Sequence, residues 1–189
     1  MATPLVVLHG QDPEHAVVVA REMDALLEGV EVHHAPTADD LGRFAPFAGL
    51  PTDDLAGLAA QSERRIIGDG DALFEQGRPA ATMFAVERGQ VVLRSAQAAR
   101  ATIVMIATAG EVLGWVTLRP EATWLTNGRA SGETAVIAIP SGAILDLLAQ
   151  GGPASRDLAQ RLFALAASHL AATQTQLVGA RVDAVISGG

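Results

Sequence analysis

Two tryptophans and two arginines form the most chemically distinctive group in the sequence. Trp115 and Trp124 are the only tryptophans in the 189 residues; Arg119 lies between them and Arg129 follows. Indole rings stack on planar or apolar ligands, and an arginine can pair with a negative group on the same molecule. This spacing predicts a pocket with aromatic walls. The alternative is that both indoles fill the space themselves and leave a closed core.

The sequence carries no recognisable catalytic pattern. Gly-x-Ser-x-Gly, His-Glu-x-x-His and the phosphate-binding P-loop are absent. Without cysteine, thiol chemistry, disulfides and Cys-ligated metals are excluded. His9, His15, His33 and His34 are expected to be ordinary surface histidines, because neighbouring strand residues point to opposite faces. We predict no enzyme activity, no metal site and no cofactor.

The charge balance argues against direct DNA binding. The chain has 13 Lys and Arg against 21 Asp and Glu, a formal charge of −8, whereas affinity for duplex DNA depends on phosphate contacts. No apolar run approaches the roughly 20 residues that cross a bilayer, and the first residues lack a basic signal-peptide region. We therefore expect a cytoplasmic protein with no membrane association.

Three segments are expected to position the candidate site. Residues 1–40 predict a small α/β appendage, with strands near 5–8 and 30–34 around a helix that begins at Asp12-Pro13. Residues 41–150 predict a β-roll that follows a short helix capped by Thr52 or Asp53 and precedes a helix at 141–148. Eight glycines give the strand-rich part its turn signals: Gly68, Gly70, Gly77, Gly89, Gly110, Gly114, Gly128 and Gly132.

Residues 151–189 predict a long helix, over about 154–178, with two apolar lines. The first line contains Leu158, Leu162, Leu165, His169 and Ala172. The second line repeats every seven residues: Phe163, Leu170 and Leu177. Two lines indicate a helix that packs on its own domain and also on a partner. The pattern does not decide which line faces the second subunit.

Several motifs resemble the cyclic-nucleotide-binding domain of Crp/Fnr-like regulators. They are a glycine-bounded hairpin at residues 70–77, an alternating apolar strand pair at 83–93 and a glycine-rich cassette at 110–139. The resemblance covers about seven-tenths of the chain and implies an α+β, mainly β fold. Its elements would be a jelly-roll-like antiparallel roll, flanking helices and a long C-terminal dimerisation helix. Haem-binding members of the superfamily make His169 a candidate axial ligand, although a histidine in a helix seam is the more common arrangement.

The cassette departs from the family at the ligand contacts. Aligned without a gap, Gly114 takes the first glycine and Arg129-Ala130 the closing pair. The ribose-binding Glu falls on Trp115, the phosphate-binding Arg on Trp124 and the next Ser on Leu125. The candidate ligand residues are thus Gly114, Trp115, Arg119, Trp124, Leu125 and Arg129. Arg129 is expected to pair with nearby carboxylates, and cAMP or cGMP is disfavoured as a ligand.

A narrower resemblance is to standalone bacterial domains with a Leu-Gly-Trp motif, in which an arginine takes the place of Thr123. Residues 181–189 leave no room for a helix-turn-helix module. We therefore expect a Crp/Fnr-like regulatory or sensor module that does not use cAMP in the usual way. It would act through homodimerisation and protein–protein contact. Three alternatives remain open: a sensor of another small ligand, the effector subunit of a transcription regulator, and a purely structural dimerisation partner.

Overall fold

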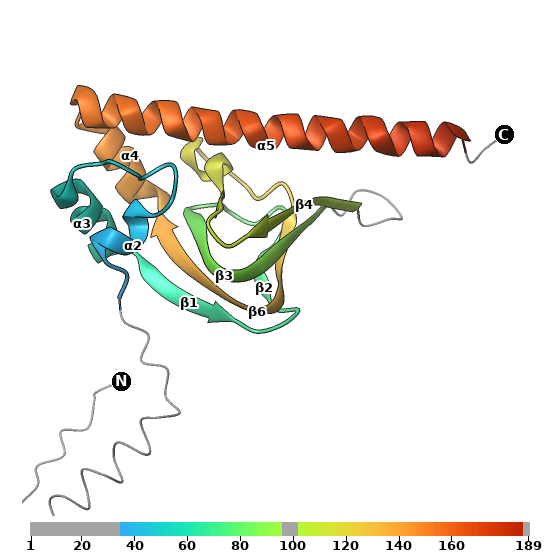
Figure 1. Ribbon diagram of the computed structural model, residues 1–189, viewed down its shortest axis with the longest axis horizontal. Coiled ribbons are helices and arrows are strands. Elements are labelled where there is room, and N and C mark those ends of the chain that lie inside the picture. The colour runs from blue at the N-terminus through green and yellow to red at the C-terminus, as the bar shows by residue number, and fades with distance from the viewer. Residues whose placement is uncertain (1–34, 96–101, 187–189) are drawn as a thin grey trace, which may run out of the picture. The chain divides into compact units, whose positions relative to one another are not determined.

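The computed structural model describes residues 35–95 and 102–186, with side chains described as far as residue 172. The elements predicted within residues 5–34, and the four histidines of that region, lie outside these ranges. Figure 1 shows the described elements in chain order. They are α2 (Ala38–Gly42), α3 (Thr52–Gln61), β1 (Glu63–Ile67), β2 (Ala72–Phe74), β3 (Thr82–Ser95), β4 (Thr102–Thr108), β5 (Val112–Leu113), the 3-10 helix η1 (Trp115–Leu118), β6 (Asn127–Pro140), α4 (Ser141–Ala149) and α5 (Gly152–Ile186).

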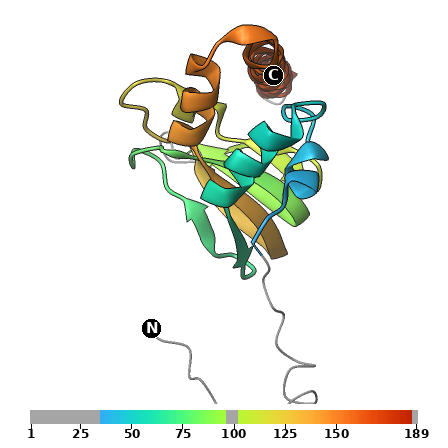
Figure 2. The ribbon, with the colours of Figure 1, turned by 90° about the vertical axis from the view of Figure 1, so that its left-hand side faces the viewer.

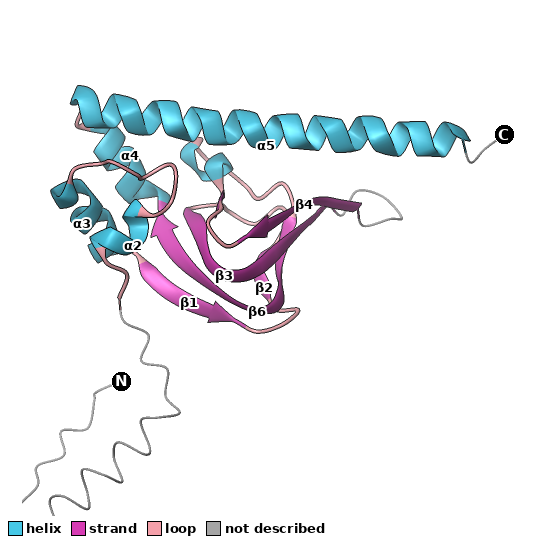
Figure 3. Ribbon diagram, viewed as in Figure 1, coloured by secondary structure: helices cyan, strands magenta, loops and turns pink. Residues whose placement is uncertain are grey.

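The strands form the predicted antiparallel roll, so the α+β, mainly β fold class is confirmed. The order along the sheet is β1-β6-β3-β4; β2 also pairs with β6, and β5 with β3. The two longest strands, β3 and β6, curve together through the centre of the sheet (Figure 3). The predicted boundary between residues 40 and 41 falls inside α2, and the described residues belong to one compact unit.

The strand pair expected over residues 83–93 is a single strand. β3 continues through this region because Gly89 adopts a left-handed conformation, with φ of 81°, where the pairing with β6 changes register. A Cβ at Gly89 would lie 2.6 Å from the Glu133 carbonyl oxygen and from Thr134 Oγ1. Glycine therefore lets the strand bend without ending.

Both faces of the central strands are buried. In β6, Ile137 and Ile139 pack beneath the helices, whereas Val136 and Ala138 point into the roll. This follows from the two-residue period of a strand, which sends successive side chains to opposite faces. Helices α2, α3 and α4 face the viewer in Figure 2 and cover the first of these two cores.

The helix ends differ in part from the sequence prediction. α3 begins after Pro51, with no side-chain cap, so the predicted capping by Thr52 or Asp53 is wrong. The helix start is instead stabilised by the Leu55 amide, which donates to the Pro51 carbonyl. α5 begins at Gly152, two residues before the predicted start, and the Ser155 hydroxyl shares its one proton between the carbonyls of Leu147 and Gly151, each 2.8 Å away.

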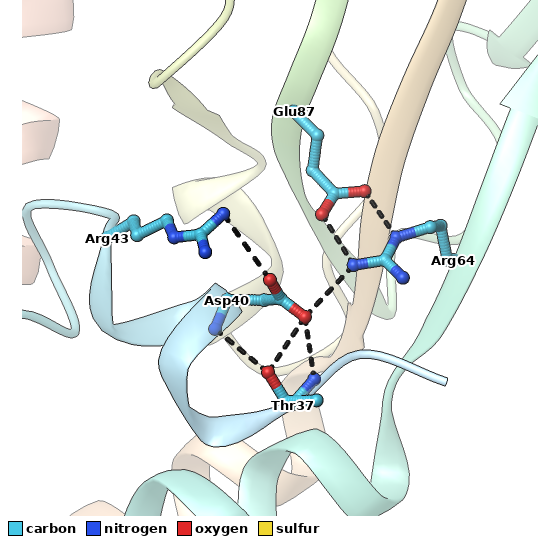
Figure 4. Close-up of polar contacts among 5 residues, drawn as sticks. All are labelled: Thr37, Asp40, Arg43, Arg64 and Glu87. Carbon is cyan, nitrogen blue, oxygen red and sulfur yellow. Dashed lines mark hydrogen bonds and ion pairs between the residues drawn. The ribbon is translucent and has the colours of Figure 1, made fainter. Parts of the chain in front are cut away.

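A charged cluster ties α2 to the sheet (Figure 4). Thr37 and Asp40 form a capping box, and Arg64 of β1 lies between Asp40, at 3.1 Å, and Glu87 of β3, at 2.6 Å. The three charged side chains are only 17–20% exposed. Burial tends to raise the pKa of Asp40, but hydrogen bonds from Thr37 and Arg64 outweigh it and the pKa is lowered. The hydrogen bonds that Arg64 donates to the Glu87 carboxylate raise the pKa of Arg64.

The two apolar lines of α5 have different surroundings. Leu158 and Leu162 are 0% and 4% exposed, and Leu165 packs against the same core. Phe163 and Leu170 are 75% and 57% exposed. Leu158, Leu162 and Leu165 of the first line therefore face the helix's own domain, whereas His169 is half-buried and Ala172 is exposed. Leu177 of the second line lies in α5 beyond the described side chains. No helix within the described residues has the length and apolar composition needed to cross a membrane.

Candidate functional site

A cavity of about 600 Å³ lies between the roll, β4 and the middle of α5. Six of the residues singled out from the sequence line it: Gly114, Trp115, Trp124, Leu125, His169 and Leu170. Arg119 and Arg129 do not. Among the described residues, the lining contains no lysine, arginine, aspartate or glutamate. It is therefore an apolar chamber with a few neutral polar groups.

The short elements around the cassette place the two tryptophans differently. Trp124 is 7% exposed, and its backbone is bound to the neighbouring turn: its amide donates to the Arg78 carbonyl at 2.9 Å, and its carbonyl accepts from Gly77 at 2.8 Å. Trp115 opens η1 and is half-buried. Leu125, at the expected serine position, is 55% exposed at the cavity edge.

Trp124 belongs to an aromatic column held between two glycines. Its indole stacks on Phe74, with ring centroids 3.8 Å apart and planes 12° from parallel, and Phe84 lies 6.0 Å away. A Cβ at Gly128 would lie 2.4 Å from Phe74 Cζ, and one at Gly114 would lie 3.1 Å from Trp124 Cη2. The absence of these two side chains makes the stack possible. Gly114, which aligns with the first glycine of the family cassette, leaves room here for the Trp124 indole.

The two candidate arginines lie outside the cavity lining. Arg129 is exposed on β6 and donates from Nη1 to the Gly70 carbonyl at 2.9 Å. Its expected pairing with carboxylates is therefore wrong: its partner is a backbone carbonyl in the hairpin before β2. Arg119 is exposed at the end of η1. Neither guanidinium takes the place of the arginine that a phosphate in the cavity would require.

His169 and Leu170 bring α5 into the cavity wall. Burial lowers the pKa of His169, and the negative charge of Glu111 offsets this only in part. Burial therefore favours the neutral form of the imidazole. Among the described residues, no group of three or more His, Asp or Glu side chains is placed to hold a metal ion.

Sequence reasoning missed the walls supplied by Phe74 and by β4. Phe74 was visible as part of the glycine-bounded hairpin, but its contact with Trp124 joins segments 50 residues apart in sequence. Val104 and Met105 line the cavity from β4. No local pattern distinguishes them from the other apolar residues of that strand, because only the sheet register places them opposite α5.

The fold and one sequence segment match known proteins. Residues 64–151 match the family model for the cyclic nucleotide-binding domain. No curated protein matches the chain in sequence. Many solved structures do match in fold, and all those described here are below 25% identical.

Three solved structures illustrate this similarity. A cyclic nucleotide-binding domain from Methylobacillus flagellatus KT has a TM-score of 0.67 at 14% identity, covering 78% of this chain and 88% of that one. A putative cyclic nucleotide-binding protein from Geobacter metallireducens GS-15 has 0.63 at 18%, covering 71% and 98%. The sensor domain of the transcriptional regulator DNR from Pseudomonas aeruginosa has 0.60 at 19%, covering 70% and 92%.

The strand order, the α5 helix and the family match over β1 to α4 agree with one another. Residues 64–151 match the cyclic nucleotide-binding domain family, and the described fold is similar to that of these three solved structures.

Proposed function

We propose that this chain is a Crp/Fnr-like regulatory module that does not bind cAMP in the usual way and acts as a homodimer through protein–protein contact. The observation that carries the proposal is the cavity, whose described lining has no charged side chain. Trp115 and Trp124 stand where the resemblance places the ribose-binding Glu and the phosphate-binding Arg.

The electrostatics of a cyclic phosphate support this proposal. A phosphate in a partly buried pocket needs a charge-assisted partner, best supplied by a bidentate arginine. Hydrogen bonds to charged groups contribute roughly 1.5–3 kcal/mol each, and every 1.4 kcal/mol or so changes affinity tenfold. Arg129 is held at the Gly70 carbonyl, outside the cavity. Losing a bidentate contact would therefore weaken micromolar binding to the millimolar range or beyond.

The outward face of α5 supports dimerisation. Phe163 is 75% exposed and lies outside the cavity lining. Leu170, seven residues further along the helix, lines the cavity but is still 57% exposed, so part of it remains available to a partner. The inward line is already buried in the domain's own core. A second copy of α5 would cover the outward line, while the net charge of −8 disfavours a nucleic-acid partner for this chain.

Two measurements test the proposed function. Titration with cAMP and cGMP, monitored by calorimetry, should give no saturable binding at micromolar concentrations; saturable micromolar binding would refute the loss of the cyclic-nucleotide site. Sedimentation equilibrium should show a dimer that Phe163→Glu weakens at least about tenfold, because the interface would then bury unpaired carboxylates. Ala164→Glu adds the same charge at an exposed position beside the line and should have a much smaller effect.

One observation favours a second candidate function, the sensing of a small ligand other than a cyclic nucleotide. If both indoles simply filled the space of a lost nucleotide, the pocket would be closed. Trp124 is indeed packed in the core, yet a cavity of about 600 Å³ remains beside it. Small-molecule sites commonly have volumes of about 300–1,000 Å³.

A further inference from the structure

We propose that the cavity binds an uncharged, largely apolar and planar molecule. The inference deepens the sensor function and rests on the proposed loss of the cyclic-nucleotide site. It is carried by three features of the described residues, namely the chemistry of the lining, the rigidity of its aromatic wall and the volume left unfilled.

The lining selects against charge. Its polar side chains are three hydroxyl groups, those of Ser95, Thr102 and Thr126, together with His169. Hydroxyls donate and accept hydrogen bonds but carry no charge, and the lowered pKa of His169 favours the neutral form of its imidazole. A ligand ion would lose water without gaining an opposite charge, and this cost is high in an apolar site. A neutral ligand avoids this cost and can still form one or two hydrogen bonds.

The aromatic wall is already formed without a ligand. Phe74 and Trp124 stack on each other at 3.8 Å, and Gly128 and Gly114 leave each ring only enough room for this arrangement. Both rings also line the cavity. A ligand therefore meets a fixed hydrophobic surface and does not have to order it, which lowers the entropic cost of binding.

The shape of the site favours a planar molecule. Trp115 lines the cavity while still half-buried, so part of its indole is available for stacking. Val104 and Met105 of β4 and Leu170 of α5 also line the cavity. Aromatic rings together with branched aliphatic and thioether groups offer a flat hydrophobic ligand an apolar surface to pack against.

Two dyes with the same carbon skeleton test this inference. N-phenyl-1-naphthylamine is neutral, and 8-anilinonaphthalene-1-sulfonate adds one sulfonate. Both fluoresce more strongly in apolar surroundings. Titrated against the full chain at pH 7.5, the neutral dye should bind saturably at one site per chain. The sulfonate should bind at least about tenfold more weakly, because the described lining offers it no cationic partner.

Matched variants locate the binding. Val104→Trp places a large ring in the cavity and should abolish saturable binding of the neutral dye. Ile103→Trp adds the same ring at the adjacent residue of β4, which is 44% exposed and outside the lining, and should leave binding unchanged. Thr126→Arg supplies the missing cation and should bring the affinities of the two dyes within about threefold of each other. Thr123→Arg, exposed and outside the lining, should not.

Circular dichroism checks that each variant folds. If Val104→Trp does not fold, the Thr126→Arg variant still tests the inference. The inference is overturned if the sulfonate binds as tightly as the neutral dye, if neither dye saturates, or if Val104→Trp binds like wild type. If neither dye binds, but the chain remains a dimer and does not bind cAMP, only the proposed class of ligand is rejected. Micromolar cAMP that displaces the neutral dye would reject the proposed function.

Discussion

Gly128→Ala should destabilise the domain through a single steric contact. Gly128 has an ordinary negative φ, so alanine introduces no backbone strain there. The new methyl group would nevertheless lie 2.4 Å from Phe74 Cζ and within 2.8 Å of two other ring carbons. Carbon atoms pack at about 3.5–4.0 Å, so the ring would have to retreat by roughly 1 Å.

The ring has no free space for that movement. Trp124 already stacks on Phe74 at 3.8 Å and is itself limited by the backbone at Gly114. Overpacking of a filled core costs about 1–3 kcal/mol. Because the aromatic column is closed at both ends, the cost of Gly128→Ala should lie at the upper limit of this range. For a chain of this size each kcal/mol lowers Tm by roughly 2–4 °C, so we expect a decrease of about 6–12 °C.

Thermal and urea unfolding would measure this change. Gly57→Ala is the control, because a Cβ there meets nothing within 4 Å and lies inside α3; it should stabilise by about 0.5–1 kcal/mol through helix propensity. In a Phe74→Leu background, Gly128→Ala should cost much less, which would assign the effect to the ring. A Gly128→Ala variant as stable as wild type would contradict the closed column.

Three further predictions concern the frame around the site. Asp40→Asn should lower the free energy of unfolding by about 1–2 kcal/mol at pH 7. Because the pKa of Asp40 is depressed in the folded state, its carboxylate stabilises the fold above the unfolded pKa of 3.8, and this stability is lost at lower pH. The difference in unfolding free energy between wild type and Asp40→Asn should therefore shrink below about pH 4. A constant difference in urea titrations from pH 7 to 2.5 would argue against the Arg64 contact. Gly89→Ala should cost at least about 3 kcal/mol through combined strain and overlap, and more than Gly110→Ala, where only the positive φ opposes a side chain; equal costs in chemical unfolding would remove the overlap argument. Ser155→Ala should cost about 1–2 kcal/mol because it removes the hydroxyl proton that the Leu147 and Gly151 carbonyls share, and an unchanged Tm would show that water replaces it.

Local pattern was sufficient to predict the roll. Glycines at Gly70 and Gly77 do adopt positive φ at the hairpin turns, and the alternating apolar residues of β6 do divide between two cores. The errors occurred where the chain had a choice of partners. Gly89 permits either a turn or a bend, and the pairing of β3 with β6 on both sides of Gly89 keeps the strand continuous. At α3, backbone hydrogen bonding made the predicted side-chain cap unnecessary.

The candidate site was predictable only along its own segment. Cassette spacing identified Gly114, Trp115 and Trp124 as neighbours of one pocket, and all three line the cavity. The stacking of Phe74 on Trp124 depends on the register of β2 on β6, which sequence alone does not set. The hydrogen bond from Arg129 to the Gly70 carbonyl depends on the same register, because the pairing of β2 with β6 brings the hairpin that contains Gly70 next to β6.

The aromatic column gives the domain a built-in optical reporter. The chain has no tyrosine and two tryptophans, so excitation at the red edge of protein absorbance reaches these indoles alone. Trp124 is enclosed and stacked on a neighbouring ring, whereas Trp115 is partly open at the cavity. The two should therefore differ in emission wavelength and in access to quenchers. A molecule entering the chamber would meet both indoles, and the larger change in emission is expected from Trp115, the more open of the two.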